Sequence, residues 1–236
     1  MGDYADLITP SDFKRWDGRI LADWMKGNED NIGATQCKQV NKLLKPIWDK
    51  CCGLLEGNHD ESIRRYNHYN FISELLEKAN NTDDKNEWKI KPAGISCFLV
   101  FKFHRKNSNE MHNIIIHARH GEGSARTSGA RALAVLRLAQ TFTNAHITVS
   151  GHLHGQESPD VPQRLIYHDG KIKAFEAIAT MTGAWIKAYA QGVPPCYLER
   201  WGTPPSKLGA PRIVFETTKE GINYTLEKTG KTGLFE

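Results

Sequence analysis

Long apolar runs are absent from this chain of 236 residues. No stretch approaches the ~20 apolar residues that a membrane-spanning helix requires, and no signal peptide is recognisable. The five cysteines are odd in number and show no C-x-x-C spacing, which excludes a zinc ribbon and indicates reduced thiols. These absences predict a cytoplasmic protein without a membrane segment.

An excess of charge of one sign is also missing. The chain carries 31 Lys and Arg against 27 Asp and Glu, a net charge of +4, and no basic run is longer than a few residues. This distribution indicates no particular macromolecular partner, although it would not repel an anionic substrate. The length suffices for one large core, and we expect one domain over residues 1–236.

Apolar periodicity predicts a succession of helices and strands, and hence an α/β protein. The expected helices span 35–50, with Pro46 as a kink or break, 62–79 and 129–142, the last with Leu133, Leu136, Ala139 and Phe142 on its apolar side. The expected strands span 52–56, 95–103, 113–119, 147–150, 164–168, 171–181, 212–217 and 222–227. The dipeptide Asp169-Gly170 predicts a hairpin turn with positive φ at both central residues.

Two short histidine-containing strings carry the chemistry, Gly57-Asn58-His59-Asp60 and Gly151-His152-Leu153-His154. Each follows an apolar run, so each is expected in a loop at the carboxyl end of a strand, where open α/β sheets bind ligands. Asn, His and carboxylate side chains are donors that Mn, Fe, Ni and Zn accept, and the glycines permit tight turns. The two strings together predict one metal site. A simpler interpretation of the first string is a helix-capping turn, in which Asn58 or Asp60 accepts hydrogen bonds from backbone N–H groups.

In kind and order these strings resemble the motifs of the calcineurin-like metallophosphoesterases, which are a D-x-H block, a G-D block, G-N-H-[DE], a lone His and G-H-x-H. Met1-Gly2-Asp3 resembles the G-D block, and His120 before Gly121 resembles the lone His. The segment Asp12-Phe13-Lys14-Arg15-Trp16-Asp17 is similar to phage-type members of the family. The D-x-H strand and the strand before the G-D block have no counterpart ahead of Met1. The expected fold is therefore the family's α/β architecture, a metallophosphoesterase β-sandwich flanked by helices, in an N-terminally truncated form.

The resemblance implies two divalent metals in the complete fold, Mn, Fe, Ni or Zn, or a single one in this chain, because the D-x-H ligands are missing. The implied metal ligands are Asp3, Asn58, His120, His152 and His154. His59 would act as general acid at the leaving oxygen, and Asp60 would orient its imidazole.

His117 competes with His120 for the role of the lone histidine. His117 continues the apolar run Ile114-Ile115-Ile116, which favours a core position. His120 is expected at the strand end. Arg126, beside a Gly-rich loop that enters a helix, and Arg64, just after the first histidine string, are candidates for binding a substrate phosphate. Solvated arginines on the first turns of helices explain both equally well.

These features predict a metal-dependent phosphoester hydrolase, and in particular a phosphodiesterase acting on a nucleotide or nucleic-acid phosphate, with manganese among the candidate metals. Two alternatives remain open. One is a phosphomonoesterase or phosphoprotein phosphatase, because the ligand set does not determine the substrate. The other is a catalytically impaired remnant that binds one metal or a partner.

Overall fold

The computed structural model describes residues 1–81, 89–107, 109–219 and 221–227. They form a mixed α/β fold of helices and several sheets, which confirms the predicted α/β class. The chain divides into two compact units, Met1–Cys97 with Ala190–Arg200, and Phe98–Tyr189 with Trp201–Glu236. The single domain expected over residues 1–236 stays a prediction. Within the described ranges, no helix combines the length and the apolarity needed to cross a membrane.

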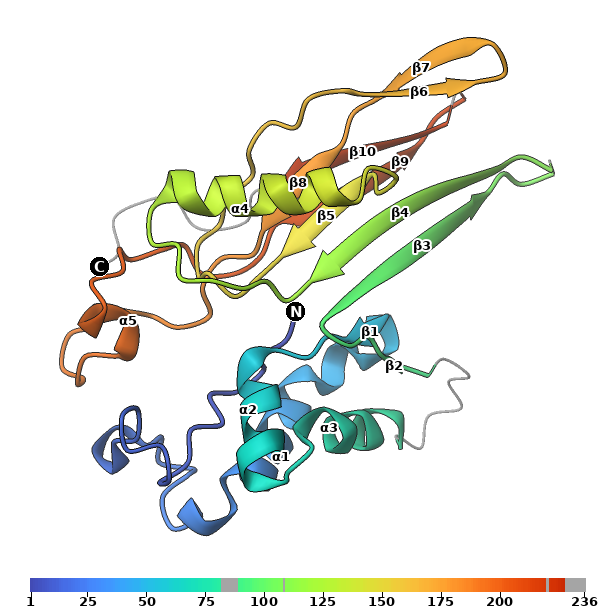
Figure 1. Ribbon diagram of the computed structural model, residues 1–236. Helices are drawn as coiled ribbons and strands as arrows, with labels where there is room; N and C mark the ends of the chain where they lie inside the picture. The colour runs from blue at the N-terminus through green and yellow to red at the C-terminus, as the bar shows by residue number, and fades with distance from the viewer. Residues whose placement is uncertain (82–88, 108, 220, 228–236) are drawn as a thin grey trace. The chain divides into compact units, whose positions relative to one another are not determined.

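The first unit is mainly helical (Figure 1). Its helices are α1 (Ile32–Leu44), α2 (Asn58–Asn67), α3 (Phe71–Asn80) and the short α5 (Tyr197–Arg200), with 3-10 turns η1 (Gly18–Ile20), η2 (Glu29–Asn31) and η3 (Lys45–Lys50). Strands β1 (Gly53–Leu54) and β2 (Lys91–Pro92) pair in parallel. Phe71, Leu75 and Cys37 form the centre of the core, and none of them is more than 1% exposed.

The helix expected over 62–79 is two helices, so this prediction is wrong. His68 adopts φ 55° and ends α2, and the Asn70 side chain accepts from the Ser73 N–H to begin α3. α2 also starts earlier than expected, so Asn58 to Asp60 form its first turn rather than a preceding loop. The break expected at Pro46 is confirmed, because α1 ends at Leu44 and the chain continues as the 3-10 turn η3.

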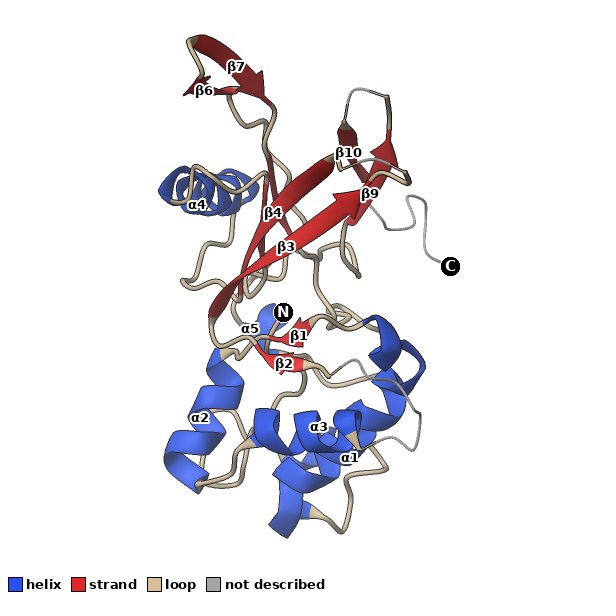
Figure 2. Cartoon of the chain, turned by 90° about the vertical axis from the view of Figure 1, so that its right-hand side faces the viewer, coloured by secondary structure: helices blue, strands red, loops and turns tan. Residues whose placement is uncertain are grey.

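The second unit is built on a four-stranded sheet of order β3-β4-β5-β8. Its strands are β3 (Ser96–His104), β4 (Met111–Arg119), β5 (Ile147–Ser150) and β8 (Ile178–Met181); β4, β5 and β8 run in parallel. The helix α4 (Ser128–Thr141) covers one face, and the antiparallel ribbon of β9 (Arg212–Thr217) and β10 (Ile222–Glu227) covers the other, as Figures 1 and 2 show. Ile114, Ile116 and Ile147 fill the β9–β10 side, and Val135, Ala139, Ala179 and Met181 fill the α4 side.

The buried residues of α4 include Ala139, as predicted, but also Arg131 and Val135, which were not predicted. Arg131, Val135 and Ala139, spaced by four residues, face inward, whereas Leu133 is 47% exposed. A salt bridge to Glu157 allows the arginine to occupy an inward position, so the apolar pattern alone misplaces this face.

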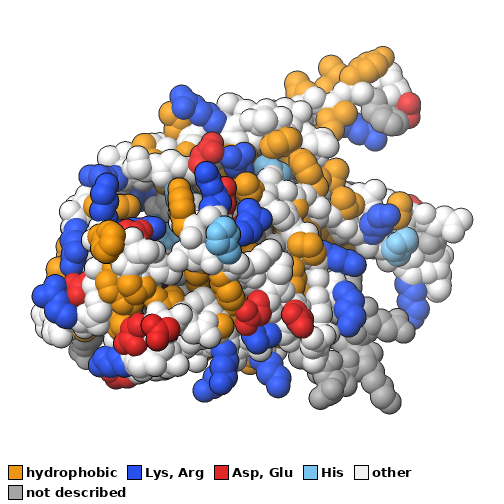
Figure 3. All heavy atoms as spheres, turned by 60° about the horizontal axis from the view of Figure 1, so that its bottom comes forward, with side chains coloured by type: hydrophobic (Ala, Val, Ile, Leu, Met, Phe, Trp, Pro, Cys, Tyr) orange, Lys and Arg blue, Asp and Glu red, His pale blue; other side chains and the backbone are white. Residues whose placement is uncertain are grey.

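The segment expected as one strand over 171–181 belongs to two sheets. β7 (Lys171–Phe175) pairs with β6 (Arg164–His168) as an antiparallel ribbon, whereas β8 joins the main sheet. The hairpin turn is confirmed, with φ 51° at Asp169 and 75° at Gly170. Leu165, Tyr167 and Ile172 stay exposed on this ribbon, and Figure 3 shows the hydrophobic side chains along it.

Candidate metal centre

The main sheet of the second unit brings two loops to one edge. The parallel neighbours β4 and β5 end on the paired residues Arg119 and Ser150. The next residues therefore begin loops side by side, and the Gly151 N–H donates to the His120 carbonyl oxygen at 2.9 Å. His152 follows one residue later. Both histidines lie at the carboxyl ends of parallel strands, where the sequence predicts them.

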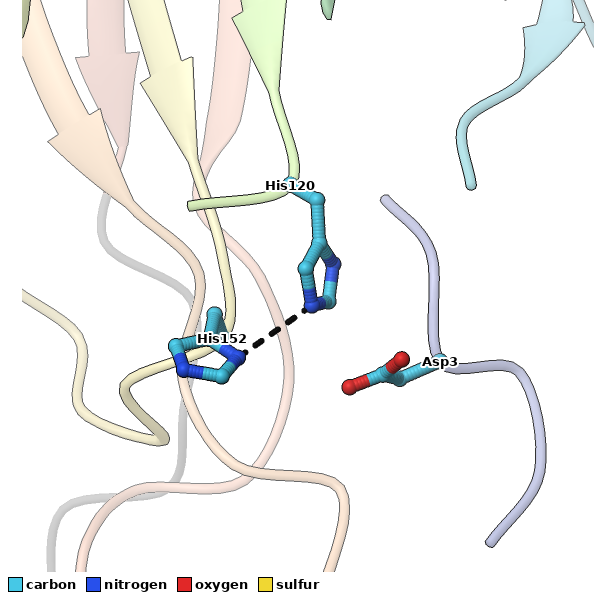
Figure 4. A group of neighbouring side chains, drawn as sticks. All are labelled: Asp3, His120 and His152. Atoms are coloured by element: carbon cyan, nitrogen blue, oxygen red, sulfur yellow. Dashed lines mark hydrogen bonds between the residues drawn. The ribbon is translucent and has the colours of Figure 1, made fainter. Parts of the chain in front are cut away.

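Figure 4 shows the imidazoles of His120 and His152 at these strand ends. Nδ1 of His152 lies 3.3 Å from Nε2 of His120, and Nε2 of His152 lies 3.0 Å from the carbonyl oxygen of Gly123. A carbonyl oxygen only accepts, so in the neutral ring Nε2 of His152 carries the proton and Nδ1 presents its lone pair to His120. Metal-binding histidines usually donate one ring N–H to a carbonyl or carboxylate and coordinate through the other nitrogen.

The separation of the two nitrogens fits one shared ion. Two imidazole nitrogens at ~2.0–2.1 Å from a zinc ion would be about 3.3 Å apart at the tetrahedral angle. The observed distance between Nε2 of His120 and Nδ1 of His152 is 3.3 Å. Imidazole suits zinc, iron and nickel, so this pair can supply two ligands to a borderline divalent ion.

Unusual backbone geometry accompanies the pair. His152 and His154 adopt φ 70° and 50°, in the left-handed region that a residue other than glycine seldom enters. Gly121, at φ 103°, has no room for a side chain, because a Cβ there would lie 2.8 Å from the Gly151 carbonyl oxygen. Strain of this kind persists only where surrounding contacts hold it, and it is common at functional sites.

His117 takes the core position that the sequence favours for it. It is fully buried in β4, and its ring packs against Phe98 and Phe142 at centroid distances of 4.9 and 4.2 Å. Burial lowers the pKa of His117, with a smaller contribution from the charge of Arg119. The structure therefore places His120, and not His117, in the loop that follows the strand.

In the first unit, the G-D and G-N-H-D strings lie against each other. The Asp3 carboxylate accepts from the His59 N–H at 2.8 Å, and the Asp60 carboxylate accepts from the N–H groups of Asp3 and Gly57 at 3.0 and 2.8 Å. A Cβ on Gly57 would lie 2.1 Å from Oδ1 of Asp3, so only glycine fits there. Both carboxylates therefore interact with N–H groups at the start of α2, where a helix favours negative charge. The capping interpretation holds for Asp60, and the metal-binding role of Asp3 stays a prediction.

The His59 ring is held by a backbone group. Its Nδ1 lies 2.5 Å from the carbonyl oxygen of Asp6. Because that oxygen only accepts, Nδ1 carries a proton and Nε2 is the nitrogen able to exchange one. The orienting role predicted for Asp60 thus has a second candidate, the Asp6 carbonyl.

The other predicted site residues are spread over both units. Asn58 is exposed on the first turn of α2, and the Arg64 guanidinium forms an ion pair with Glu56 at 2.9 Å. His154 follows His152 by two residues, and its carbonyl oxygen accepts from the Ser206 hydroxyl. Among the described side chains, His154 does not join the group of mutually close ligand atoms that contains His120 and His152. Arg126 is exposed just before α4, so its binding of phosphate stays a prediction, as does that of Arg64.

Sequence reasoning missed the side chains that support the loops after β4 and β5, which carry His120 and His152 and are called the ligand loops below. Arg131 is 8% exposed and donates through Nε and Nη2 to one oxygen of Glu157, at 3.1 and 2.8 Å, while the Ser128 hydroxyl donates to the other at 2.8 Å. Gly155 lies under the guanidinium, and a Cβ there would be 2.2 Å from Nε of Arg131. The sequence signal that could have found Arg131 was its spacing of eight residues from Ala139, which places both on one side of a helix.

Comparison with known proteins yields no match: no family model matches the sequence, no curated protein matches it, and no solved structure matches the fold.

Proposed function

We propose that this chain is a metal-dependent phosphoester hydrolase, with His120 and His152 as two ligands of a divalent ion. The observation that carries the proposal is the 3.3 Å approach of Nε2 of His120 to Nδ1 of His152, with Nε2 of His152 hydrogen-bonded to the Gly123 carbonyl. The two imidazole nitrogens, the distance between them and the hydrogen bond that holds the His152 ring all fit a pair of metal ligands. The finer fold assignment, a metallophosphoesterase β-sandwich, is part of the same proposal and rests on the resemblance of the motifs.

The resemblance assigns Asp3, Asn58 and His154 to the same ligand set. A divalent ion held by these residues would supply activation of water and charge neutralisation at the phosphoryl oxygens. Asp3 offers a carboxylate whose Oδ1 accepts from the His59 N–H. We expect Asp3→Asn to weaken metal binding, because the variant keeps the acceptor for that N–H but loses the negative charge.

His59 would donate a proton to the leaving oxygen. Its Nδ1–H is directed to the Asp6 carbonyl, so the ring is held with Nε2 as the exchanging nitrogen. Alkoxides are poor leaving groups in phosphomonoesters and phosphodiesters alike, so either substrate requires such help. We propose a nucleotide or nucleic-acid phosphodiester as the substrate class, on the resemblance of the motifs.

An activity panel tests the proposal. The full chain is assayed with bis-p-nitrophenyl phosphate, p-nitrophenyl phosphate, cyclic nucleotides and single-stranded DNA, each with added Mn²⁺ or Ni²⁺, beside His152→Ala. Metal-dependent hydrolysis of the diesters that is lost in His152→Ala supports the proposal. Preference for the monoester would replace the diesterase by a phosphomonoesterase. Metal binding through His152 without hydrolysis of any substrate would indicate the impaired remnant.

A further inference from the structure

The loop that carries His152 is held by residues far from it in sequence. Leu153 is buried against α4 and β8, and the backbone of Glu157 pairs with Met181. Between these anchors, Gly155 lies directly under the guanidinium of Arg131. The loop therefore has a strained start, at His152, and a fixed end, at Glu157.

Arg131 touches both loops that flank the histidine pair. Its Nε and Nη2 donate to Oε1 of Glu157, at the end of the loop after β5. Its Nη1 donates at 2.8 Å to the carbonyl oxygen of Arg126, in the loop after β4. That second loop also contains Gly123, whose carbonyl oxygen holds Nε2 of His152.

We infer that Arg131 is a positioning residue for the metal-binding pair, because one guanidinium fixes the loop that carries His152 and the loop whose Gly123 carbonyl orients its ring. The inference rests on the proposed function, because the two histidines that are held in place are the proposed metal ligands. The side chains of Arg131 and Glu157 are only 10% and 15% exposed. A buried ion pair is poor evidence for stability alone, because desolvation offsets much of the attraction. The bonds of Arg131 to the loop after β4 and to the loop after β5 indicate instead that it fixes the positions of these two loops.

Arg164, the first residue of β6, provides a matched control because its guanidinium supports the same helix, α4. Its guanidinium donates to the carbonyl oxygen of Ala139, in the last turn of α4, and to those of Phe142 and Ala145, just after the helix. Arg131 lies near the amino end of the helix, so the two arginines support α4 at opposite ends. Removing either guanidinium should destabilise the unit, but only Arg131 is bonded to the ligand loops.

The experiment compares Arg131→Lys, Arg131→Met and Glu157→Gln with Arg164→Lys and Arg164→Met. Co²⁺ affinity is measured by titration, the ligand field by visible absorption, and the His152 tautomer by long-range ¹H–¹⁵N NMR on the metal-free protein. We expect the Arg131 and Glu157 variants to bind Co²⁺ about tenfold or more weakly, with an altered spectrum and a mixture of His152 tautomers. We expect the Arg164 variants to lose thermal stability but to keep affinity, spectrum and tautomer.

Two results would overturn the inference. The first is an Arg131→Lys protein whose His152 tautomer stays entirely Nε2-protonated and whose Co²⁺ spectrum equals that of the parent. The second is an equal loss of affinity in the Arg164 variants, which would reduce Arg131 to a general stabiliser of α4. If His152→Ala binds Co²⁺ as tightly as the parent, the proposed metal function fails. The NMR readout still decides the positioning role in that case, because it needs no metal.

Discussion

Replacing Gly155 by alanine probes the packing on which the ligand loop depends. The added Cβ would lie 2.2 Å from Nε of Arg131 and 2.4 Å from its Cζ. Ordinary contact between such atoms is ~3.5 Å or more, so the guanidinium has to move by more than ~1 Å. Its bonds to Glu157, now 2.8 and 3.1 Å, would then exceed hydrogen-bonding distance.

The expected loss of stability follows from these contacts. Overpacking a buried site destabilises by about 1–3 kcal/mol, and a hydrogen bond to a charged group contributes about 1.5–3 kcal/mol. Because the two effects share one displacement, we expect a combined loss of about 2–4 kcal/mol for Gly155→Ala. For a protein of this size, that loss lowers the melting temperature by roughly 5–15 °C.

Circular dichroism during thermal and urea unfolding measures this loss. The control is Gly129→Ala, on the first turn of α4, where a Cβ would meet nothing within 4 Å. That substitution should be neutral or stabilising by up to about 1 kcal/mol, because alanine favours helix. A Gly155→Ala protein within about 0.5 kcal/mol of the parent would refute the packing argument, as would an equal loss in Gly129→Ala.

Three further predictions concern histidines. His120→Ala should weaken Mn²⁺ binding by about tenfold or more in calorimetry, whereas His117→Ala should lower stability with little effect on affinity; equal losses of affinity would contradict the strand-end assignment. His59→Gln should lower kcat while metal content by elemental analysis stays unchanged, and a parallel loss of metal would make His59 a ligand instead. Burial, and secondarily the charge of Arg164, lowers the pKa of His146 from 6.5. The unfolded chain therefore takes up more protons than the folded one as the pH falls below about 6.5, and the free energy of unfolding decreases with acidification. Urea unfolding of His146→Gln between about pH 7 and 5 should show a flatter dependence, and an unchanged slope would exclude His146 as the cause.

Local signals predicted several elements closely. The strands expected over 147–150, 164–168, 212–217 and 222–227 match β5, β6, β9 and β10 in both bounds. Their apolar runs and the Asp169-Gly170 turn act over a few residues, so the sequence displays them directly. The choice of His120 over His117 followed from the same local reasoning about where a strand ends.

Long-range contacts explain what the sequence did not reveal. The inward position of Arg131 depends on Glu157, which lies 26 residues further along the chain. The break between α2 and α3 depends on the left-handed conformation of His68, which no periodic pattern predicts. Similarly, the first histidine string became the start of a helix because Asp60 accepts from the Gly57 N–H, and capping residues and metal ligands are drawn from the same residue types.

We propose that His120 and His152 bind one ion together. Anomalous diffraction at the metal edge, from crystals of the full chain grown with Mn²⁺ or Zn²⁺, tests it most directly. We expect one anomalous peak at ~2.0–2.2 Å from both Nε2 of His120 and Nδ1 of His152, with the Gly123 carbonyl oxygen still hydrogen-bonded to Nε2 of His152. A fully occupied metal peak elsewhere on the chain, with no density between Nε2 of His120 and Nδ1 of His152, would contradict this proposal.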